Sequence, residues 1–533
     1  MVGILNGEVG LGGPRPSLRA RPSLRTRVQR GPHLQWLLAC VVGIAVAVPA
    51  LAADFENPKA GKPPKAKPNR QTAAEGVPPL PLPATPIRRS EKKREPAPPG
   101  LIGMINFSDT RALLQDGKRV ETAAFPTTQI DIERLINVAN FRLNVRYRYM
   151  PITLEKFSWD PQELPILYLT GWTEMPRLSD PLLDRLRRYL YDGGTLVVHA
   201  QCGREEFVNS ARREIARLMP NRRLAPLDTD SPLFSAYVPI KEMRFRKDDG
   251  PFKSIPPYLE AVYLGLRPAV IFSPIDLNCG WDVENNPIQG GILYHQNDAV
   301  QLGLNIITVA LANFQYARAW GVQKVYPQEA LKSRDQLVLA QIVHNGDWDP
   351  TPHALPALLK HIQSGTTLNV QFKREVLNLG ETEVFKYPVL YMTGLRDFKF
   401  SNVEVARLKN YLASGGVLVA DAAAGSRAFD VAFRRELKRF APGELKALPQ
   451  DSPLYQTPYK IRNVDYSDLV RSRENVNVPV LETVTVDGQL SVIYSPYGLA
   501  AGWEQLGFAY NRGVADSDAL RLGVNILAYA MMH

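Results

Sequence analysis

The sequence predicts two tandem α/β domains, each built on a doubly wound parallel sheet. Three observations lead to this prediction. A module of about 200 residues occurs twice, each copy alternates short apolar strands with amphipathic helices, and a region of different composition precedes the first copy. The predicted segments are a signal peptide at 1–53, a disordered linker at 54–100, repeat 1 at 101–320, a second linker at 321–333 and repeat 2 at 334–533.

The N-terminal segment has the pattern of an export signal. An apolar core from Leu37 to Val48 follows several arginines and leads into Ala-Leu-Ala at 50–52, a typical cleavage motif. The preceding stretch is unusually long and contains RPSLR twice, so a translation start near Val28 would give a signal of ordinary length. We expect export to the periplasm or cell envelope. An uncleaved signal that anchors the chain in the inner membrane is the alternative.

The positive charge of the chain belongs to its N-terminal part. Residues 1–53 contain six arginines and one glutamate, and 54–100 contain ten basic residues, five acidic residues and twelve prolines. The remaining residues hold 48 basic and 47 acidic side chains. A Pro-rich, charged segment with few apolar residues is typical of a disordered, semi-rigid spacer. We therefore expect no nucleic-acid partner, and membrane contact only through an uncleaved N-terminal segment.

The internal duplication is visible in short matching stretches that keep one order. PILYLTG at 165–171 matches PVLYMTG at 388–394, and the correspondence extends over some 200 residues. Such a match indicates duplication of a whole domain rather than a solenoid of short repeats. The further pairs are 184–200 with 406–422, 207–217 with 429–439, 230–234 with 451–455, 270–281 with 492–503, and 299–307 with 519–527.

The elements follow from the period of the apolar residues. Short apolar runs that end in Gly or a polar residue predict buried strands, and apolar residues spaced three or four apart predict helices. Alternating strands and helices predict a parallel sheet covered on both faces, with ligands at the carboxyl ends of its strands. In repeat 1 we expect strands at 143–148, 166–171, 195–200 and 269–274 and helices at 179–190, 207–219 and 299–311; in repeat 2 we expect an early helix at 354–362 and a strand at 368–371.

These motifs together resemble a bacterial protein family. The strand ending in Thr-Gly, the Gly-Gly turn, the strand ending in His-Ala or Asp-Ala, the DSPL turn and the strand leading into Gly-Trp resemble the family called domain of unknown function 4159. Repeat 2 is the closer match and includes GDWDPTPHALPALL at 346–359. The resemblance implies two flavodoxin-like domains of the class I glutamine amidotransferase and trehalose-utilisation type. It implies no activity, substrate or cofactor.

The predicted strand ends outline a binding crevice in each repeat. The paired tryptophans are either stacking platforms for a sugar ring or packed over the sheet. The crevice residues are Thr170, Gly171, His199 and Trp281 in repeat 1, and Thr393, Gly394, Asp421 and Trp503 in repeat 2.

Two cysteines distinguish repeat 1 from repeat 2. Cys202 and Cys279 both follow predicted strands, and repeat 2 has alanine at both corresponding positions. An exported chain favours a disulfide between them, which would close a loop of about 77 residues and contribute about 3–4 kcal/mol. Alternatively, Cys202 could act as a nucleophile with His199 or His295. The amidotransferase elbow G-x-C-x-G and its downstream H-x-E are both absent here, because Arg204 follows Cys202 at the second position and His295 lacks the glutamate.

Repeat 2 and the helices of both repeats carry two further motifs. His344, Asp347 and Asp349 offer metal-ligating groups without a fixed metal spacing, and the same stretch suits turns that cap a helix. We therefore expect no metal and no cofactor. Arg-Arg-Glu occurs at 212–214 and at 434–436, and its presence in both repeats indicates a structural role on a solvated helix face.

The function predicted from these residues is non-catalytic. We expect an exported cell-envelope protein that binds a small polar ligand or an envelope protein, or serves as a scaffold, because no nucleophile, base or metal motif is held by both repeats. The alternative is a hydrolase or amidotransferase-like enzyme that uses a Cys/His pair in repeat 1.

Overall fold

The computed structural model describes most of the chain from residue 96 onward. The predicted signal peptide, linker residues 54–95, most of the second linker and the predicted strand at 368–371 lie outside the described residues. Residues 94–533 form one compact unit. No helix among the described residues is long and apolar enough to cross a membrane. The described residues are 96–532 without 106–109, 116–117, 124–129, 153, 155, 283–290, 323–337, 366–373, 382, 442 and 487.

Repeat 1 is built on a sheet of seven strands. Five neighbouring strands are parallel, as the alternation of strands and helices predicts, and the sixth runs antiparallel to the fifth. The strand order is β4 (Arg148–Ile152), β1 (Gly100–Ile105), β5 (Ile166–Gly171), β6 (Thr195–Ala200), β11 (Arg267–Ser273), β10 (Glu260–Leu264) and β7 (Ala225–Pro226).

Repeat 2 repeats this topology strand for strand. Its parallel strands are again followed by an antiparallel pair at one edge. The strand order is β14 (Glu375–Leu377), β13 (Ala340–Ile342), β15 (Val389–Gly394), β16 (Val417–Ala422), β19 (Gln489–Ser495), β18 (Glu482–Val486) and β17 (Lys446–Ala447).

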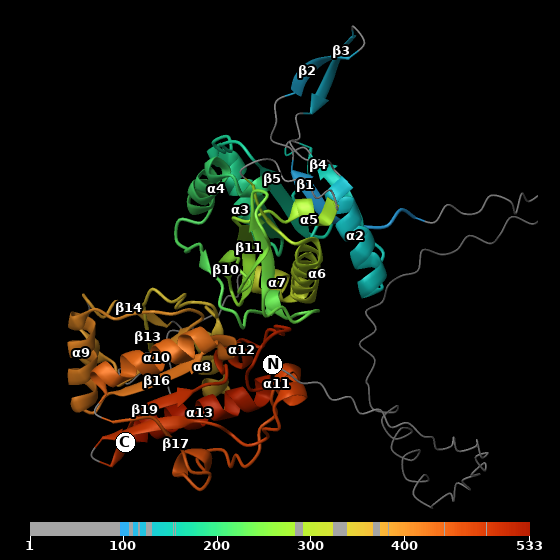
Figure 1. Ribbon diagram of the computed structural model, residues 1–533. Helices are drawn as coiled ribbons and strands as arrows, with labels where there is room; N and C mark the ends of the chain where they lie inside the picture. The colour runs from blue at the N-terminus through green and yellow to red at the C-terminus, as the bar shows by residue number, and fades with distance from the viewer. Residues whose placement is uncertain are drawn as a thin grey trace, which may run out of the picture. The chain divides into compact units, whose positions relative to one another are not determined.

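Each sheet separates two apolar cores, because successive strand residues point to opposite faces. In β5, Leu167 and Leu169 belong to one core, while Ile166 and Tyr168 belong to the other. The helices that cover the two faces supply the other half of each core (Figure 1). In repeat 1 they are α2 (Ile130–Leu143), α3 (Asp180–Tyr191), α4 (Glu205–Leu218), α5 (Asn278–Asp282), α6 (Gln296–Ala312) and α7 (Phe314–Gly321). In repeat 2 they are α8 (Ala354–Gly365), α9 (Asn402–Ala413), α10 (Arg427–Phe440), α11 (Asp468–Arg473), α12 (Ala500–Glu504) and α13 (Asp516–Met532).

Small additions to repeat 1 lie outside the main sheet. A three-stranded sheet has the order β12-β8-β9, and β2 and β3 form a separate antiparallel pair. Short 3-10 turns precede or follow several strands in both repeats. The bounds are β2 (Thr110–Gln115), β3 (Lys118–Ala123), β8 (Met243–Lys247), β9 (Lys253–Ile255), β12 (Ile292–Tyr294), η1 (Gln201–Gly203), η2 (Pro232–Phe234), η3 (Val384–Lys386), η4 (Ala423–Gly425) and η5 (Pro453–Tyr455).

The expected strand at 143–148 is wrong by about five residues. Helix α2 continues to Leu143, and Asn144 then adopts a φ of 53°, the left-handed conformation in which many helices end. The strand β4 therefore begins only at Arg148. The apolar pattern of LNVRYR belongs partly to the end of a helix, which short windows do not separate from a strand.

The Arg-Arg-Glu motif has a shared structural role, but its glutamate is not solvated. Glu214 and Glu436 are each 1% exposed. Glu214 accepts hydrogen bonds from the Leu178 backbone amide and from Arg213 and Arg217. In repeat 2, Glu436 accepts hydrogen bonds from the corresponding groups, which are the Phe400 backbone amide, Arg435 and Arg439. The motif thus joins α4 to the loop between β5 and α3, and α10 to the loop between β15 and α9.

Candidate functional site

The turn after the central strand has the same unusual backbone in both repeats. Between β6 and α4, Cys202 has a φ of 53°, and between β16 and α10, Ala424 has a φ of 49°. For a residue with a side chain this left-handed conformation costs about 1–2 kcal/mol. A sharp strand-to-helix turn is the usual support for a nucleophile. Because alanine adopts it equally in repeat 2, the turn is a property of this fold and not of a thiol.

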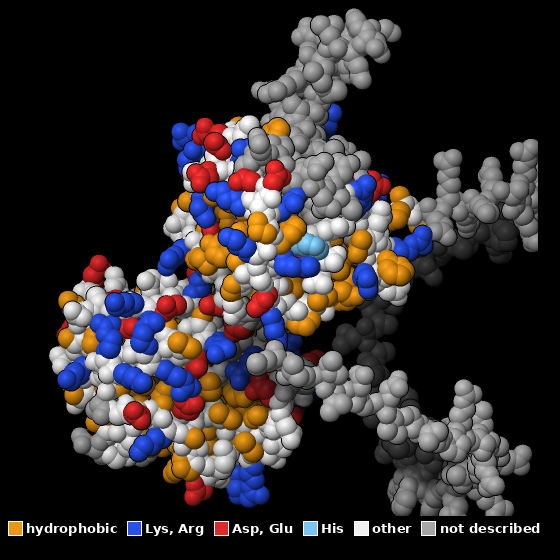
Figure 2. Space-filling view, viewed as in Figure 1, with side chains coloured by type: hydrophobic (Ala, Val, Ile, Leu, Met, Phe, Trp, Pro, Cys, Tyr) orange, Lys and Arg blue, Asp and Glu red, His pale blue; other side chains and the backbone are white. Residues whose placement is uncertain are grey.

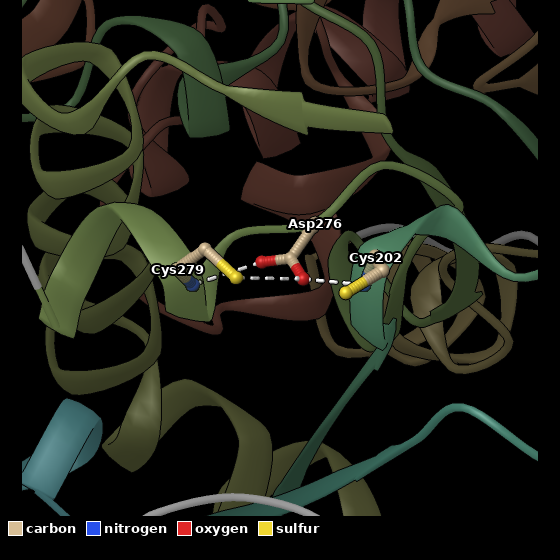
Figure 3. Close-up of side chains that lie close together, drawn as sticks. All are labelled: Cys202, Asp276 and Cys279. Carbon is tan, nitrogen blue, oxygen red and sulfur yellow. Dashed lines mark hydrogen bonds between the residues drawn. The ribbon is translucent and has the colours of Figure 1, made fainter. Parts of the chain in front are cut away.

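In repeat 1 this turn forms one wall of a cluster of two thiols and a carboxylate. Figure 3 shows Cys202, Asp276 and Cys279 directed toward one another from η1, from the loop after β11 and from α5. The Cys202 amide donates to Asp276 Oδ2, the Cys279 amide donates to Asp276 Oδ1 at 2.9 Å, and the Cys279 thiol lies 3.4 Å from Oδ2. One ligating atom from each residue lies within 4.8 Å of the other two.

Both cysteines of this cluster are in the reduced, thiol form in the structure. Cys202 is buried, and Cys279 is partly exposed. The hydrogen bond with Cys202, burial, and the nearby Asp276 together raise the pKa of the Cys279 thiol. Cys279 is therefore protonated and weakly nucleophilic near neutral pH. The disulfide between the two cysteines remains a prediction.

The two histidines proposed as bases are bonded to other groups. His199 is fully buried, with Nδ1 at 2.8 Å from the Tyr168 hydroxyl and Nε2 at 3.3 Å from both Thr170 Oγ1 and Asn278 Oδ1. Burial lowers the pKa of His199, so the ring stays neutral. His295 instead caps α6, where its Nδ1 accepts the Asn297 amide at 3.3 Å. These contacts give each ring a structural task.

In repeat 2 a buried carboxylate replaces His199. Asp421 accepts hydrogen bonds from the Tyr391 hydroxyl at 2.6 Å and from the amides of Leu499 and Ala500 at 2.8 and 3.2 Å. Burial raises the pKa of Asp421 despite these donors, and no part of its side chain is exposed. Thr393 donates its hydroxyl to the Asp421 carbonyl at 3.0 Å. Asp421 thus closes the turn after β19.

The remaining predicted crevice residues mainly pack the core. The Trp281 and Trp503 indoles donate to the carbonyls of Ala299 and Ala519 at 2.9 and 2.8 Å, and both rings are almost completely buried. They are therefore packed over the sheet and are not platforms for an external sugar ring. A Cβ at Gly171 or Gly394 would come within about 2.7 Å of a phenylalanine ring, so these glycines permit close helix packing.

The metal candidates of repeat 2 do not converge. His344 binds the Thr393 carbonyl through Nε2 at 2.9 Å and accepts the Gly346 amide through Nδ1. Burial lowers the pKa of His344 to about 4. Asp347 pairs with Arg396 at 2.7 Å, and Asp349 pairs with both terminal nitrogens of Arg374. Within the described part of the chain, the cluster of Cys202, Asp276 and Cys279 is the group whose ligating atoms come together.

Asp276 is the functional-site residue that the sequence analysis missed. The pairing of 270–281 with 492–503 places it opposite Gly498 of repeat 2. A Cβ at Gly498 would lie 2.8 Å from the Ala424 amide, which shows how closely the two loops approach. In repeat 1 the Asp276 carboxylate occupies the space between the two loops and accepts a hydrogen bond from the Cys202 amide. The Asp-for-Gly difference between the aligned repeats was the available signal.

An open groove lies beside the carboxyl end of β5 in repeat 1. The Trp172 indole, 36% exposed, directly follows the strand, and the first turns of α4 form the opposite side. Repeat 2 has Leu395 in place of Trp172 and Ser426 in place of Arg204. Figure 2 shows that acidic and basic side chains are interspersed on the drawn face of the molecule. The groove is lined by Trp172, Thr173, Glu174, Arg204, Glu206, Asn209, Ser210 and Arg213.

Comparisons with known proteins agree with the duplication. The model of a family described as domain of unknown function, DUF4159, matches residues 120–311 and again 338–531. No curated protein matches the chain. Five chains of solved structures match it. One, a ThuA-like protein from Bacteroides uniformis, is 14% identical, with a TM-score of 0.20 over 39% of this chain and 95% of that chain.

Proposed function

Because this chain belongs to the family called domain of unknown function 4159 and carries its domain twice, we propose its function from the site alone. The protein is a non-catalytic binding protein of the bacterial cell envelope, and the groove beside β5 in repeat 1 holds a small polar ligand. The observation that carries this proposal is the contrast between buried, internally bonded groups at the strand ends and the exposed Trp172 in a polar groove.

The lining of the groove favours a saccharide. An exposed indole offers an apolar face to the C–H groups of a sugar ring, and the surrounding side chains donate and accept hydrogen bonds. Two arginines, Arg204 and Arg213, stand beside two glutamates, Glu174 and Glu206, so the formal charges of the lining cancel. A neutral oligosaccharide rich in hydroxyl groups matches this balance better than a strongly charged ligand.

The geometry weighs against the enzyme alternative. Cys202 is 2% exposed, and both candidate bases hold structural hydrogen bonds. The positive φ of Cys202 would favour a nucleophile if it were confined to repeat 1, but Ala424 shares it. Catalysis by a Cys/His pair would therefore require the side chains around the turn to move.

Calorimetric titration of the full chain with a panel of neutral oligosaccharides tests the binding proposal. We expect at least one sugar to bind, Trp172→Ala to weaken it at least tenfold, and the sugar to be recovered unchanged. Phe141→Ala is the matched control, because Phe141 is an exposed aromatic residue on α2, outside the groove lining, and its loss should leave binding unchanged. Undiminished binding by Trp172→Ala, or hydrolysis of the sugar, would contradict the proposal.

The proposed location has its own test. The export pattern at 36–53 supports secretion of the mature chain into the periplasm or envelope. N-terminal sequencing of protein from a cell fraction should find a mature end near Asp54. Peptides from residues 1–27 in that fraction would contradict both cleavage and the later translation start.

A further inference from the structure

The cluster of Cys202, Asp276 and Cys279 takes no part in the proposed saccharide groove. None of the three residues lines that groove. They come from two segments of the chain that lie more than 70 residues apart: η1, and the loop after β11 with the adjoining helix α5. The fold brings their ligating atoms within 4.8 Å of one another. Two sulfurs and a carboxylate oxygen at such separations are groups that can ligate one metal ion.

The separations between the ligating atoms suit a cation that accepts sulfur ligands and is coordinated tetrahedrally. With Zn–S near 2.3 Å and Zn–O near 2.0–2.2 Å, the ligand atoms of a tetrahedral site lie about 3.5–3.8 Å apart. The Cys279 sulfur lies 3.4 Å from Asp276 Oδ2. The two sulfurs lie within 4.8 Å of each other, so a small rotation of either side chain would bring them to the edge length of such a site.

The backbone holds the carboxylate in the required orientation. Asp276 receives the Cys279 amide on Oδ1 at 2.9 Å and the Cys202 amide on Oδ2 (Figure 3). Hydrogen bonds to a ligating carboxylate fix its orientation and are a common feature of metal centres. The turn that presents Cys202 is fixed as well, because repeat 2 reproduces it with alanine.

Repeat 2 lacks all three side chains at once. The corresponding residues are Ala424, Gly498 and Ala501, although the strands and turns that carry them are the same. If these three positions were needed only to pack the core, the alanines and glycine of repeat 2 would be sufficient there. The joint presence of two thiols and a carboxylate in repeat 1 indicates that the three act as a set.

We propose that Cys202, Asp276 and Cys279 of repeat 1 bind one thiophilic divalent cation of the zinc type. Each thiol loses its proton to solvent as its sulfur binds the cation, so the three ligands carry three negative charges against two positive ones. The fourth position of the tetrahedron is left for water or another small ligand. Two sulfurs select against magnesium and calcium, which prefer sets of oxygen ligands.

Equilibrium dialysis of the reduced full chain against Zn²⁺, followed by metal analysis, tests the proposal. Co²⁺ serves as a spectroscopic probe, because thiolate ligands give it charge-transfer absorption and a tetrahedral site gives it intense visible bands. We expect one equivalent of metal per chain, with both signals lost in Cys202→Ala and in Cys279→Ala. Asp276→Asn should weaken binding at least tenfold.

The controls separate a metal site from misfolding and from stray thiols. Alanine occupies both cysteine positions in repeat 2, so the alanine variants should fold, and circular dichroism checks this. Cys40→Ser removes a thiol outside the described residues and should leave binding intact. Trp172→Ala should also keep the metal, so failure of the saccharide proposal is distinguishable from failure of this one.

Three results would overturn the assignment. One is the absence of stoichiometric metal in the reduced chain. Another is Co²⁺ binding without thiolate absorption, or binding that survives loss of either cysteine. The third is a Cys202–Cys279 disulfide in protein isolated from the envelope, found by non-reducing peptide mass spectrometry, because a disulfide would consume both ligands.

Discussion

The buried carboxyl group of Asp131 should make the protein less stable as the pH rises. Asp131 lies in the first turn of α2, is fully buried, and accepts the Ile132 amide at 2.6 Å. Burial raises the pKa of Asp131 from 3.8 to about 7, against the lowering effect of Asn278 and the Ile132 amide. The nearby carboxylates of Asp282 and Asp276 raise it further.

The sign and size of the effect follow from proton linkage. Between pH 4 and pH 7 the folded chain keeps a proton on Asp131 that the unfolded chain has lost, so the free energy of unfolding falls as the pH rises. A shift of about three pH units corresponds to about 4 kcal/mol in total, of which about 2–3 kcal/mol falls between pH 5 and pH 8. Asp131→Asn resembles the protonated group at every pH and should escape this loss.

Urea unfolding of the full chain at pH 5 and pH 8, with a metal chelator present, measures the difference. The stability of Asp131→Asn relative to the natural sequence should increase by about 2–3 kcal/mol between the two pH values. Asp192→Asn, at an exposed position after α3, is the matched control and should show no such change. If the stability difference for Asp131→Asn stayed constant between pH 5 and pH 8, the carboxyl group would not be buried in its protonated form.

Other buried groups give predictions of the same kind. Glu214→Gln and Glu436→Gln should each cost about 3 kcal/mol in urea unfolding, because two arginines would face a neutral amide. The pKa of His344 is lowered to about 4 in the folded chain. As the pH falls below 6.5, this histidine therefore binds a proton in the unfolded chain before it does so in the folded chain. The free energy of unfolding should therefore fall by about 3 kcal/mol from pH 6.5 to pH 4. The His344→Asn variant should lack this decrease. Trp281→Phe and Trp503→Phe should each cost about 2 kcal/mol in thermal or urea unfolding, through the lost indole hydrogen bond and lost volume, and leave saccharide binding unchanged.

The central parallel strands β5, β6 and β11, with their counterparts in repeat 2, were predictable because they are short apolar runs between amphipathic helices, whereas β1 and β13 were not predicted. The antiparallel edge was not predicted, although the sequence carries a signal for it. Gly265, with a φ of 64°, joins β10 to β11, and Gly488, with a φ of 84°, follows an aspartate between β18 and β19. Asp-Gly between two apolar runs is a strong hairpin signal. A two-residue connection cannot cross over the sheet, so the second strand must run antiparallel.

The candidate site was less predictable than the fold because its partners are distant in the sequence. Both cysteines were identified from their positions after strands, but their common neighbour, Asp276, depends on how two loops approach each other. The histidines were chosen for their chemistry, and their burial in the packed core could not be read from a single sequence. His199 lies at the carboxyl end of a strand as expected, yet its neighbours Tyr168 and Asn278 engage both ring nitrogens.

The duplication supplies an internal test of which features belong to the fold and which belong to function. The strained turn, the buried tryptophans and the Arg-Arg-Glu network occur in both repeats, so each is explained by the needs of the shared backbone. Two features of repeat 1 have different residues at the aligned positions of repeat 2: the thiol and carboxylate cluster, which aligns with Ala424, Gly498 and Ala501, and the exposed Trp172 of the polar groove, which aligns with Leu395. Since the backbone of repeat 2 is built without them, folding alone does not require them. Repeat 1 is therefore where ligand and metal binding should be sought, and transplanting Cys, Asp and Cys into positions 424, 498 and 501 of repeat 2 would show whether the common backbone suffices to create the metal site.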